Sequence, residues 1–141
     1  MAKKRTKTSR LATACKLVQL LARLRETDCN GRGRCVSCGK LLDWRQAQGG
    51  HFQAKGRNYN AACTMEENVH LQCSRCNLTL GGASAGYSQW MYATYPEDVI
   101  EEIKKKSFET LGRDEIEERI IELRKMCREL AKTKNFVVKV P

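Results

Sequence analysis

Two Cys-x-x-Cys pairs constrain this chain more than any other feature of its sequence. Cys35-Val-Ser-Cys38 and Cys73-Ser-Arg-Cys76 are separated by 34 residues. A two-residue gap lets both sulfur atoms of one turn reach the same ion, and zinc takes four such ligands in a tetrahedron. Gly39 follows the first pair and suits the tight turn of such a knuckle. The spacing predicts one structural zinc site, with a pair of redox dithiols as the alternative.

The rest of the composition agrees with a reducing compartment. The N-terminal Met-Ala-Lys-Lys-Arg-Thr-Lys lacks the apolar stretch of a secretory signal, and no apolar run is long enough to span a membrane. We therefore expect a cytoplasmic protein, in which clustered cysteines indicate a metal before a disulfide. Four further cysteines have no metal-ligand spacing, and of these Cys15 and Cys127 suit apolar helix faces: Cys15, Cys29, Cys63 and Cys127.

The fold class predicted from these patterns is α+β, with a small zinc-stapled core between flanking N- and C-terminal helices. With 141 residues, of which 6% are aromatic, the chain buries only a modest core, and such cores often need a metal. We expect a basic arm at 1–10, a zinc-stapled domain at 11–95 and a helical extension at 96–141. The predicted elements are a helix at 11–25, a short hairpin within 35–80 followed by a helix near the second cysteine pair, helices from 87 past 91, at 96–106 and at 113–132, and a short terminal strand at 136–140.

Positive charge is concentrated at one end of the chain. Residues 1–34 contain ten Lys or Arg residues and two acidic residues, whereas residues 97–141 contain eleven of each. The formal net charge is +10. A polyanion partner is the simplest interpretation, and nucleic acid is the commonest polyanion. The alternative is a solvated basic tail that only aids solubility.

Both histidines of the chain lie in the loop that the zinc would close. His51 follows Gly49-Gly50, and His70 lies in Asn68-Val69-His70-Leu71-Gln72, which leads directly into Cys73. Asn77 follows the last cysteine of the second pair. A lone histidine is usually structural, but two histidines beside two asparagines in such a loop indicate a catalytic site.

The order of these motifs resembles the zinc-containing HNH nucleases, which have a ββα-metal core, and most closely the phage NinG/Rap recombination endonuclease family. The resemblance covers about residues 11–130, and its specific part is the segment from Gly50 to Asn77. It implies a metal-dependent endonuclease that cleaves branched recombination DNA, such as D-loops and Holliday junctions, in the cytoplasm of a phage host. The sequence itself indicates only the DNA backbone as substrate.

The same resemblance assigns roles to three residues. His51, on the second strand of the hairpin, would be the general base, and imidazole titrates near neutrality, as that role requires. Asn68 would brace the local loop or orient His51. Asn77 would hold a catalytic magnesium or manganese ion, since an amide oxygen is an acceptable hard ligand.

The sequence departs from the wider HNH pattern at two points. Many HNH enzymes place Asp before the base as a second metal ligand, but this chain has Gly50 there. His70 is then the nearest candidate ligand and Asp43 a weaker one, with a supporting or DNA-contacting role as the alternative for His70. Leu78-Thr79-Leu80 follows Asn77 where relatives often carry Lys, so one phosphate contact is either missing or supplied from elsewhere.

Further residues near the motifs suit DNA. Lys55, Arg57 and Arg75 flank the predicted site and are predicted phosphate contacts, with plain surface charge as the alternative. Three aromatic residues suit core packing better than base stacking: Trp44, Tyr87 and Trp90.

Two other interpretations use only part of the sequence. A non-catalytic zinc-ribbon protein that binds nucleic acid would need the cysteines and the basic arm but not His51 and Asn77. A protein adaptor would use an apolar stripe at near-heptad spacing in the last helix, formed by Ile116, Ile120, Leu123, Cys127 and Leu130. That stripe predicts either a homodimer seam or, since two heptads are short for a coiled coil, packing within its own domain.

Overall fold

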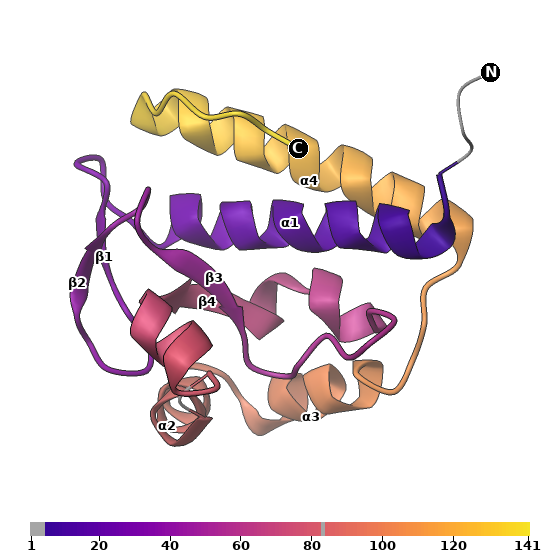
Figure 1. Ribbon diagram of the computed structural model, residues 1–141, viewed down its shortest axis with the longest axis horizontal. Coiled ribbons are helices and arrows are strands. Elements are labelled where there is room, and N and C mark those ends of the chain that lie inside the picture. Colours follow the sequence, from indigo (N-terminus) through magenta and orange to yellow (C-terminus); the bar gives the residue numbers. More distant parts are fainter. Residues whose placement is uncertain (1–4, 83) are drawn as a thin grey trace.

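The computed structural model describes residues 5–82 and 84–141 and confirms an α+β fold (Figure 1). Its helices are α1 (Lys7–Arg25), α2 (Ser84–Thr94), α3 (Glu97–Lys106) and α4 (Arg113–Lys134). Its strands are β1 (Arg32–Arg34), β2 (Leu41–Asp43), β3 (Gln48–His51) and β4 (Val69–Gln72). Short turns complete it: the 3₁₀ turns η1 (Ala61–Thr64) and η2 (Glu66–Asn68), and the π-helical turn η3 (Arg75–Thr79). No helix in these ranges is both long and apolar enough to cross a membrane.

Helix α1 begins earlier than the sequence predicts. The hydroxyl of Thr6 accepts a hydrogen bond from the Ser9 amide at 3.1 Å and so caps the helix at Lys7. Arg10 forms an ion pair of 2.7 Å with Glu117 of α4. The prediction of a basic arm through residue 10 is therefore wrong for residues 7–10, which form the first turn of the helix.

Helix α1 is buried on two sides. Figure 1 shows it between α4 and the β3–β4 pair. The sequence predicted one apolar face, but side chains all around much of the helix are buried: Leu11, Ala14, Cys15, Leu17, Val18, Leu20, Leu21, Ala22 and Leu24. A helix that is apolar on most sides can be stable only between two layers, and this arrangement makes α1 the centre of the fold.

The strands form two antiparallel pairs, where the sequence predicted a single short hairpin. β1 pairs with β2 and encloses the first cysteine pair in its turn. β3 pairs with β4 across the long connection 52–68, with Gly50 opposite His70 and His51 opposite Val69. His51 therefore ends the first strand of its pair, and its predicted place on a second hairpin strand is wrong.

The segment after β4 brings the second cysteine pair into a helical turn, as expected. The turn is short, because η3 ends at Thr79 and the next helix begins only at Ser84. Gly81 and Gly82 both have positive φ angles, of 60° and 94°. Glycine adopts this conformation at little cost, so the chain can leave the turn sharply.

The C-terminal region packs on the N-terminal helix. The apolar stripe of α4 is buried against α1 in the same chain, with Ile116, Ile120, Leu123 and Cys127 fully covered. Four residues of the stripe are thus core, as the alternative of packing within the same domain predicts, and Leu130 is half-buried at its end. Residues 136–140 are extended but form no strand, so that prediction is wrong. Phe136 instead stacks on Trp44, with ring centroids 5.2 Å apart.

The close approach of β3 to α1 gives a testable prediction. A Cβ atom at Gly49 would lie 2.5 Å from the Cα atom of Gln19, closer than any real contact. We expect Gly49→Ala to push the strand off α1 and to lower the free energy of unfolding by about 1–3 kcal/mol, as overpacking does. Urea denaturation measures this change.

The control is Gly112→Ala at the start of α4, where the nearest atom to the new Cβ lies at 3.7 Å. We expect this variant to change the free energy of unfolding by less than about 1 kcal/mol. Equal destabilisation of the two variants would contradict tight packing of β3 on α1.

Candidate functional site

The two Cys-x-x-Cys pairs meet, as the spacing predicts. The four sulfur atoms of Cys35, Cys38, Cys73 and Cys76 all lie within 4.8 Å of one another. The Sγ atoms of Cys38 and Cys73 are 3.8 Å apart. Zinc–sulfur bonds of about 2.3 Å place tetrahedral thiolates about 3.8 Å apart, so the cluster fits a zinc ion. The four residues can hold a structural zinc between the β1–β2 turn and η3.

Hydrogen bonds among these four thiols favour a negative charge that the cluster shares. Desolvation raises the pKa of Cys73, but hydrogen bonds from the Cys76 amide and from the neighbouring thiols outweigh it and lower that pKa to about 7. Desolvation and the adjacent thiols raise the pKa of Cys76. The four thiols therefore share their protons. A cation that binds to the sulfur atoms displaces these protons, as expected of zinc ligands.

A hollow next to the zinc cluster brings His51 and Asn77 together. It has a volume of about 290 Å³, and its walls come from α1, β3, the loop after β3 and η3. Gln19 and Lys55 also line it. Its lining is Gln19, Gly49, His51, Ala54, Lys55, Asn77, Leu78, Gly81 and Gly82.

The surroundings of His51 fix its tautomer. Its Nε2 atom lies 3.1 Å from the carbonyl oxygen of Cys63 and 3.5 Å from the Sγ atom of Cys15. A carbonyl oxygen only accepts hydrogen bonds, so Nε2 carries the hydrogen. The Nδ1 atom is then the basic nitrogen of the ring.

Two buried thiols beside His51 were not assigned from the sequence. A hydrogen bond from the Cys63 thiol outweighs burial and, with a further contribution from His51, lowers the pKa of Cys15 to about 5. The same pairing raises the pKa of Cys63. The Cys15 sulfur lies next to the Nε2 hydrogen of His51 and so helps to hold the imidazole ring in place.

Asn68 is fully buried and braces the loop that follows β3. Its Oδ1 atom accepts a hydrogen bond of 2.7 Å from the Gln53 amide. Its Nδ2 atom donates to the carbonyl oxygens of Gln53 and Ala62, at 3.1 and 2.9 Å. These bonds fix the chain just beyond His51, and Asn68 does not itself line the hollow.

Asn77 enters the hollow with a defined orientation. Its Nδ2 atom donates a hydrogen bond of 2.7 Å to the Oε1 atom of Gln48, which leaves its Oδ1 atom as the available metal ligand. Its own amide donates to the Cys73 carbonyl oxygen at 3.0 Å. The zinc-binding turn therefore sets the position of Asn77.

The structure explains why glycine precedes His51. A Cβ atom at Gly50 would lie only 1.7 Å from the Oε1 atom of Gln72, the residue after Leu71 on β4. Gln72 is fully buried and donates hydrogen bonds to Ser37 and to the Gly82 carbonyl oxygen. The space that a carboxylate would need at position 50 is filled by this glutamine.

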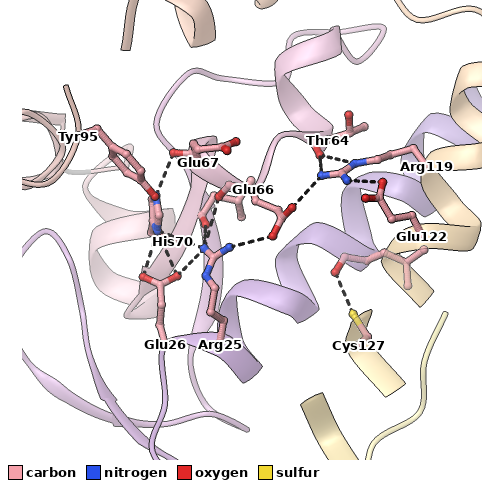
Figure 2. Close-up of polar contacts among 12 residues, drawn as sticks. Arg25, Glu26, Thr64, Glu66, Glu67, His70, Tyr95, Arg119, Glu122 and Cys127 are labelled. Carbon is pink, nitrogen blue, oxygen red and sulfur yellow. Dashed lines mark hydrogen bonds and ion pairs between the residues drawn. The ribbon is translucent and has the colours of Figure 1, made fainter. Parts of the chain in front are cut away.

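His70 lies apart from the hollow. Figure 2 shows its ring between Glu26 and Tyr95. Its Nδ1 atom lies 3.1 Å from the Glu26 carboxylate, and its Nε2 atom 2.9 Å from the Glu67 carbonyl oxygen. The residue is 2% exposed and packs 4.5 Å from Trp90, centroid to centroid. Both ring nitrogens of His70 are therefore engaged by other groups, and the residue does not line the hollow that contains Asn77.

Figure 2 also shows a network of charged side chains that includes Arg25, Glu66 and Arg119. Arg25 of α1 lies 3.6 Å from the Glu66 carboxylate, which lies 3.4 Å from Arg119 of α4. Arg119 also donates to the Thr64 carbonyl oxygen at 3.0 Å. These bonds tie α1 and α4 to the turns that precede β4, so this network supports the fold around the hollow.

The other predicted site residues are divided between two places. Lys55 lines the hollow, and its ammonium group lies 5.3 Å from the ring centroid of Tyr59. Arg57 is exposed on the same loop. Arg75 lines a second, adjoining depression over the zinc cysteines, together with Lys40. Asp43 lies on β2, outside the hollow, where its carboxylate accepts from the Arg45 amide at 3.0 Å.

The aromatic residues pack in the core, as expected. Tyr87 is buried and donates a hydrogen bond of 2.6 Å to the Gly50 carbonyl oxygen. Trp44 is covered by Phe136 and by the guanidinium groups of Arg23 and Arg45. These side chains are therefore not available to stack on a base.

Gln19 is the residue of the hollow that the sequence did not point to. It lies in the middle of α1, and nothing in the helical pattern distinguishes it from other polar positions. Only the packing of β3 on α1 brings it beside His51.

One family model matches most of the chain. The family model described as "Bacteriophage Lambda NinG protein" matches residues 2–134. Searches of curated proteins and of solved structures found no match. The matched range includes both cysteine pairs, the hollow and all of α4.

The cysteine cluster predicts zinc that is essential to folding. We expect one zinc ion per chain, and we expect Cys76→Ser to lose zinc and to lower the melting temperature by about 10 °C or more. Cys29→Ser is the matched control, because Cys29 is exposed and outside the cluster. Elemental analysis and thermal denaturation measure the two effects, and full zinc occupancy in Cys76→Ser would contradict the assignment.

Proposed function

This chain belongs to the bacteriophage NinG family, and we propose that it is a metal-dependent endonuclease that hydrolyses phosphodiester bonds of DNA. The observation that carries the proposal is the meeting of His51 and Asn77 in one hollow, with the basic nitrogen of His51 identified by its hydrogen bonds. In this proposal the β3–β4 pair and η3 serve as a ββα-metal core of the HNH kind, which the zinc cysteines stabilise.

His51 acts as the general base in this mechanism. A phosphodiester resists attack because its anionic oxygens repel nucleophiles, so a nuclease must deprotonate a water molecule and hold it in line. The Nδ1 atom of His51 accepts the proton from water. The Cys63 carbonyl oxygen and the sulfur of Cys15 accept from the Nε2 hydrogen, and they stabilise the positive charge that the ring then gains.

Asn77 would hold the catalytic cation through its Oδ1 atom. The ion, magnesium or manganese, would neutralise charge on the leaving oxygen. Among the residues described, no carboxylate lines the hollow. Magnesium in such sites relies on substrate phosphates as well as protein oxygens. The DNA phosphate would therefore supply the anionic ligand, and cation binding would depend on DNA.

The charge of the chain supports DNA as the substrate. In the proposal, Lys55 within the hollow and Arg75 over the cysteine cluster would contact phosphates, and Arg57 would extend the basic surface along the loop. We extend the proposal to branched recombination intermediates, D-loops and Holliday junctions, from the resemblance of the motifs to the recombination endonucleases. Recognition of DNA shape would suffice for such substrates.

Cleavage of a synthetic four-way junction and of a matched linear duplex tests the proposal. With magnesium, we expect the wild type to cut the junction, and His51→Ala to cut it about 10²–10⁴-fold more slowly, because the general base is lost. We expect Asn77→Ala to be slower as well, and Asn30→Ala, on an exposed turn away from the hollow, to match the wild type. Magnesium is omitted rather than chelated in the metal-free reaction, so that zinc stays bound.

Binding to the same DNAs, followed by fluorescence anisotropy, separates catalysis from affinity. We expect His51→Ala to bind as the wild type does. Binding by all variants, with no cleavage by the wild type in magnesium or manganese, would overturn the proposal and leave a zinc-ribbon protein that only binds nucleic acid.

A further inference from the structure

Two large apolar side chains are exposed beside Asn77. Leu78 is 68% exposed and Leu80 is 51% exposed, and both lie on or directly after η3. Single exposed leucines are common on protein surfaces. These two differ because they lie two residues apart, on or directly after the turn that carries Asn77.

The surroundings of each leucine combine apolar and positive groups. Leu78 lines the hollow with His51, Asn77 and Lys55. Leu80 lines the adjoining depression of about 180 Å³, together with Lys40 and Arg75. Apolar side chains next to positively charged groups suit nucleic acid as a ligand. The leucines can contact the flat apolar faces of bases, and the positive groups can contact the negative phosphates.

The turn that carries the leucines is held firmly at its base. The amide of Leu80 donates to the Arg75 carbonyl oxygen at 2.8 Å, and the amide of Gly82 donates to that of Cys76, also at 2.8 Å. Gln72 donates to the Gly82 carbonyl oxygen at 2.8 Å. The backbone is therefore fixed to the zinc-binding residues, while the two side chains project from it. A rigid turn with apolar tips can separate stacked bases without being displaced itself.

We propose that Leu78 and Leu80 form a wedge that inserts between unstacked bases next to the phosphate held at His51 and Asn77. The proposal rests on the proposed function, since it takes DNA as the ligand. Apolar side chains inserted at a base step pay the cost of unstacking, and that cost is smallest where pairing is already interrupted. The wedge thus favours branch points over continuous duplex and supplies the structural preference of the enzyme.

The test uses 2-aminopurine, a base whose fluorescence rises when it leaves the stack, placed at the branch point of a four-way junction. Binding is measured in the His51→Ala background without magnesium, so that no DNA is cut. We expect fluorescence to rise on binding the junction and to change little on binding a linear duplex. With Leu78→Ser and Leu80→Ser together, we expect the rise to disappear and the preference for junction over duplex to fall about tenfold.

Two control variants separate the wedge from general effects. Ile121→Ser removes an equally exposed apolar side chain, 68% exposed, on α4, and should change neither readout. Leu78→Met with Leu80→Met keeps the apolar tips and should retain both. Zinc content and melting temperature show that each variant is folded.

The other possible outcomes decide between the wedge, the nuclease and a contact between copies of the chain. A full fluorescence rise and an unchanged preference in the double serine variant would overturn the wedge. So would loss of self-association in that variant with no change in either readout, since the leucines would then be a contact between copies of the chain. Unstacking by a wild type that never cuts would uphold the wedge and reject only the nuclease, whereas absence of DNA binding would reject both.

Discussion

The burial of α1 between α4 and the β3–β4 pair is the constraint on which the rest of the structure depends. Gly49 lets β3 lie directly against the helix backbone at Gln19, so no side chain separates them. This contact brings Gln19 and Cys15 of α1 beside His51, the last residue of β3. The opposite side of α1 is covered by the apolar stripe of α4, so most of that stripe is buried within the same chain.

The cysteine cluster positions the other half of the hollow. It joins the β1–β2 turn to η3, and Asn77 follows its last ligand directly, so a zinc ion there would hold Asn77 in place. The proposed base and the proposed cation ligand thus come from two separately fixed elements, a strand held by a helix and a turn held by cysteines. Preorganisation of this kind keeps reacting groups in position without further cost when the substrate binds.

Several sequence predictions were wrong because they treated local patterns separately. The predicted basic arm includes the first residues of α1, because Thr6 caps this helix before its apolar pattern starts. A terminal strand was predicted at 136–140. Phe136 instead stacks on the ring of Trp44, and these residues join no sheet. His70 was a reasonable metal ligand by its place in the motif. On the paired strands, however, His70 lies opposite Gly50, and His51 lies opposite Val69. Because adjacent residues of a strand point to opposite faces, the side chain of His70 points to the other face, toward Glu26 and Tyr95.

The sequence by itself determined the four cysteines that can hold zinc, the α+β class, most of the helices, and the family, because each depends on spacing or periodicity within short stretches of chain. Only the tertiary structure decided which residues share the hollow. The pairing of His51 with Asn77, the entry of Gln19 and the exclusion of His70 depend on contacts between elements far apart in sequence. The glycine at position 50 likewise depends on the buried side chain of Gln72 across the strand pair, which no local pattern encodes.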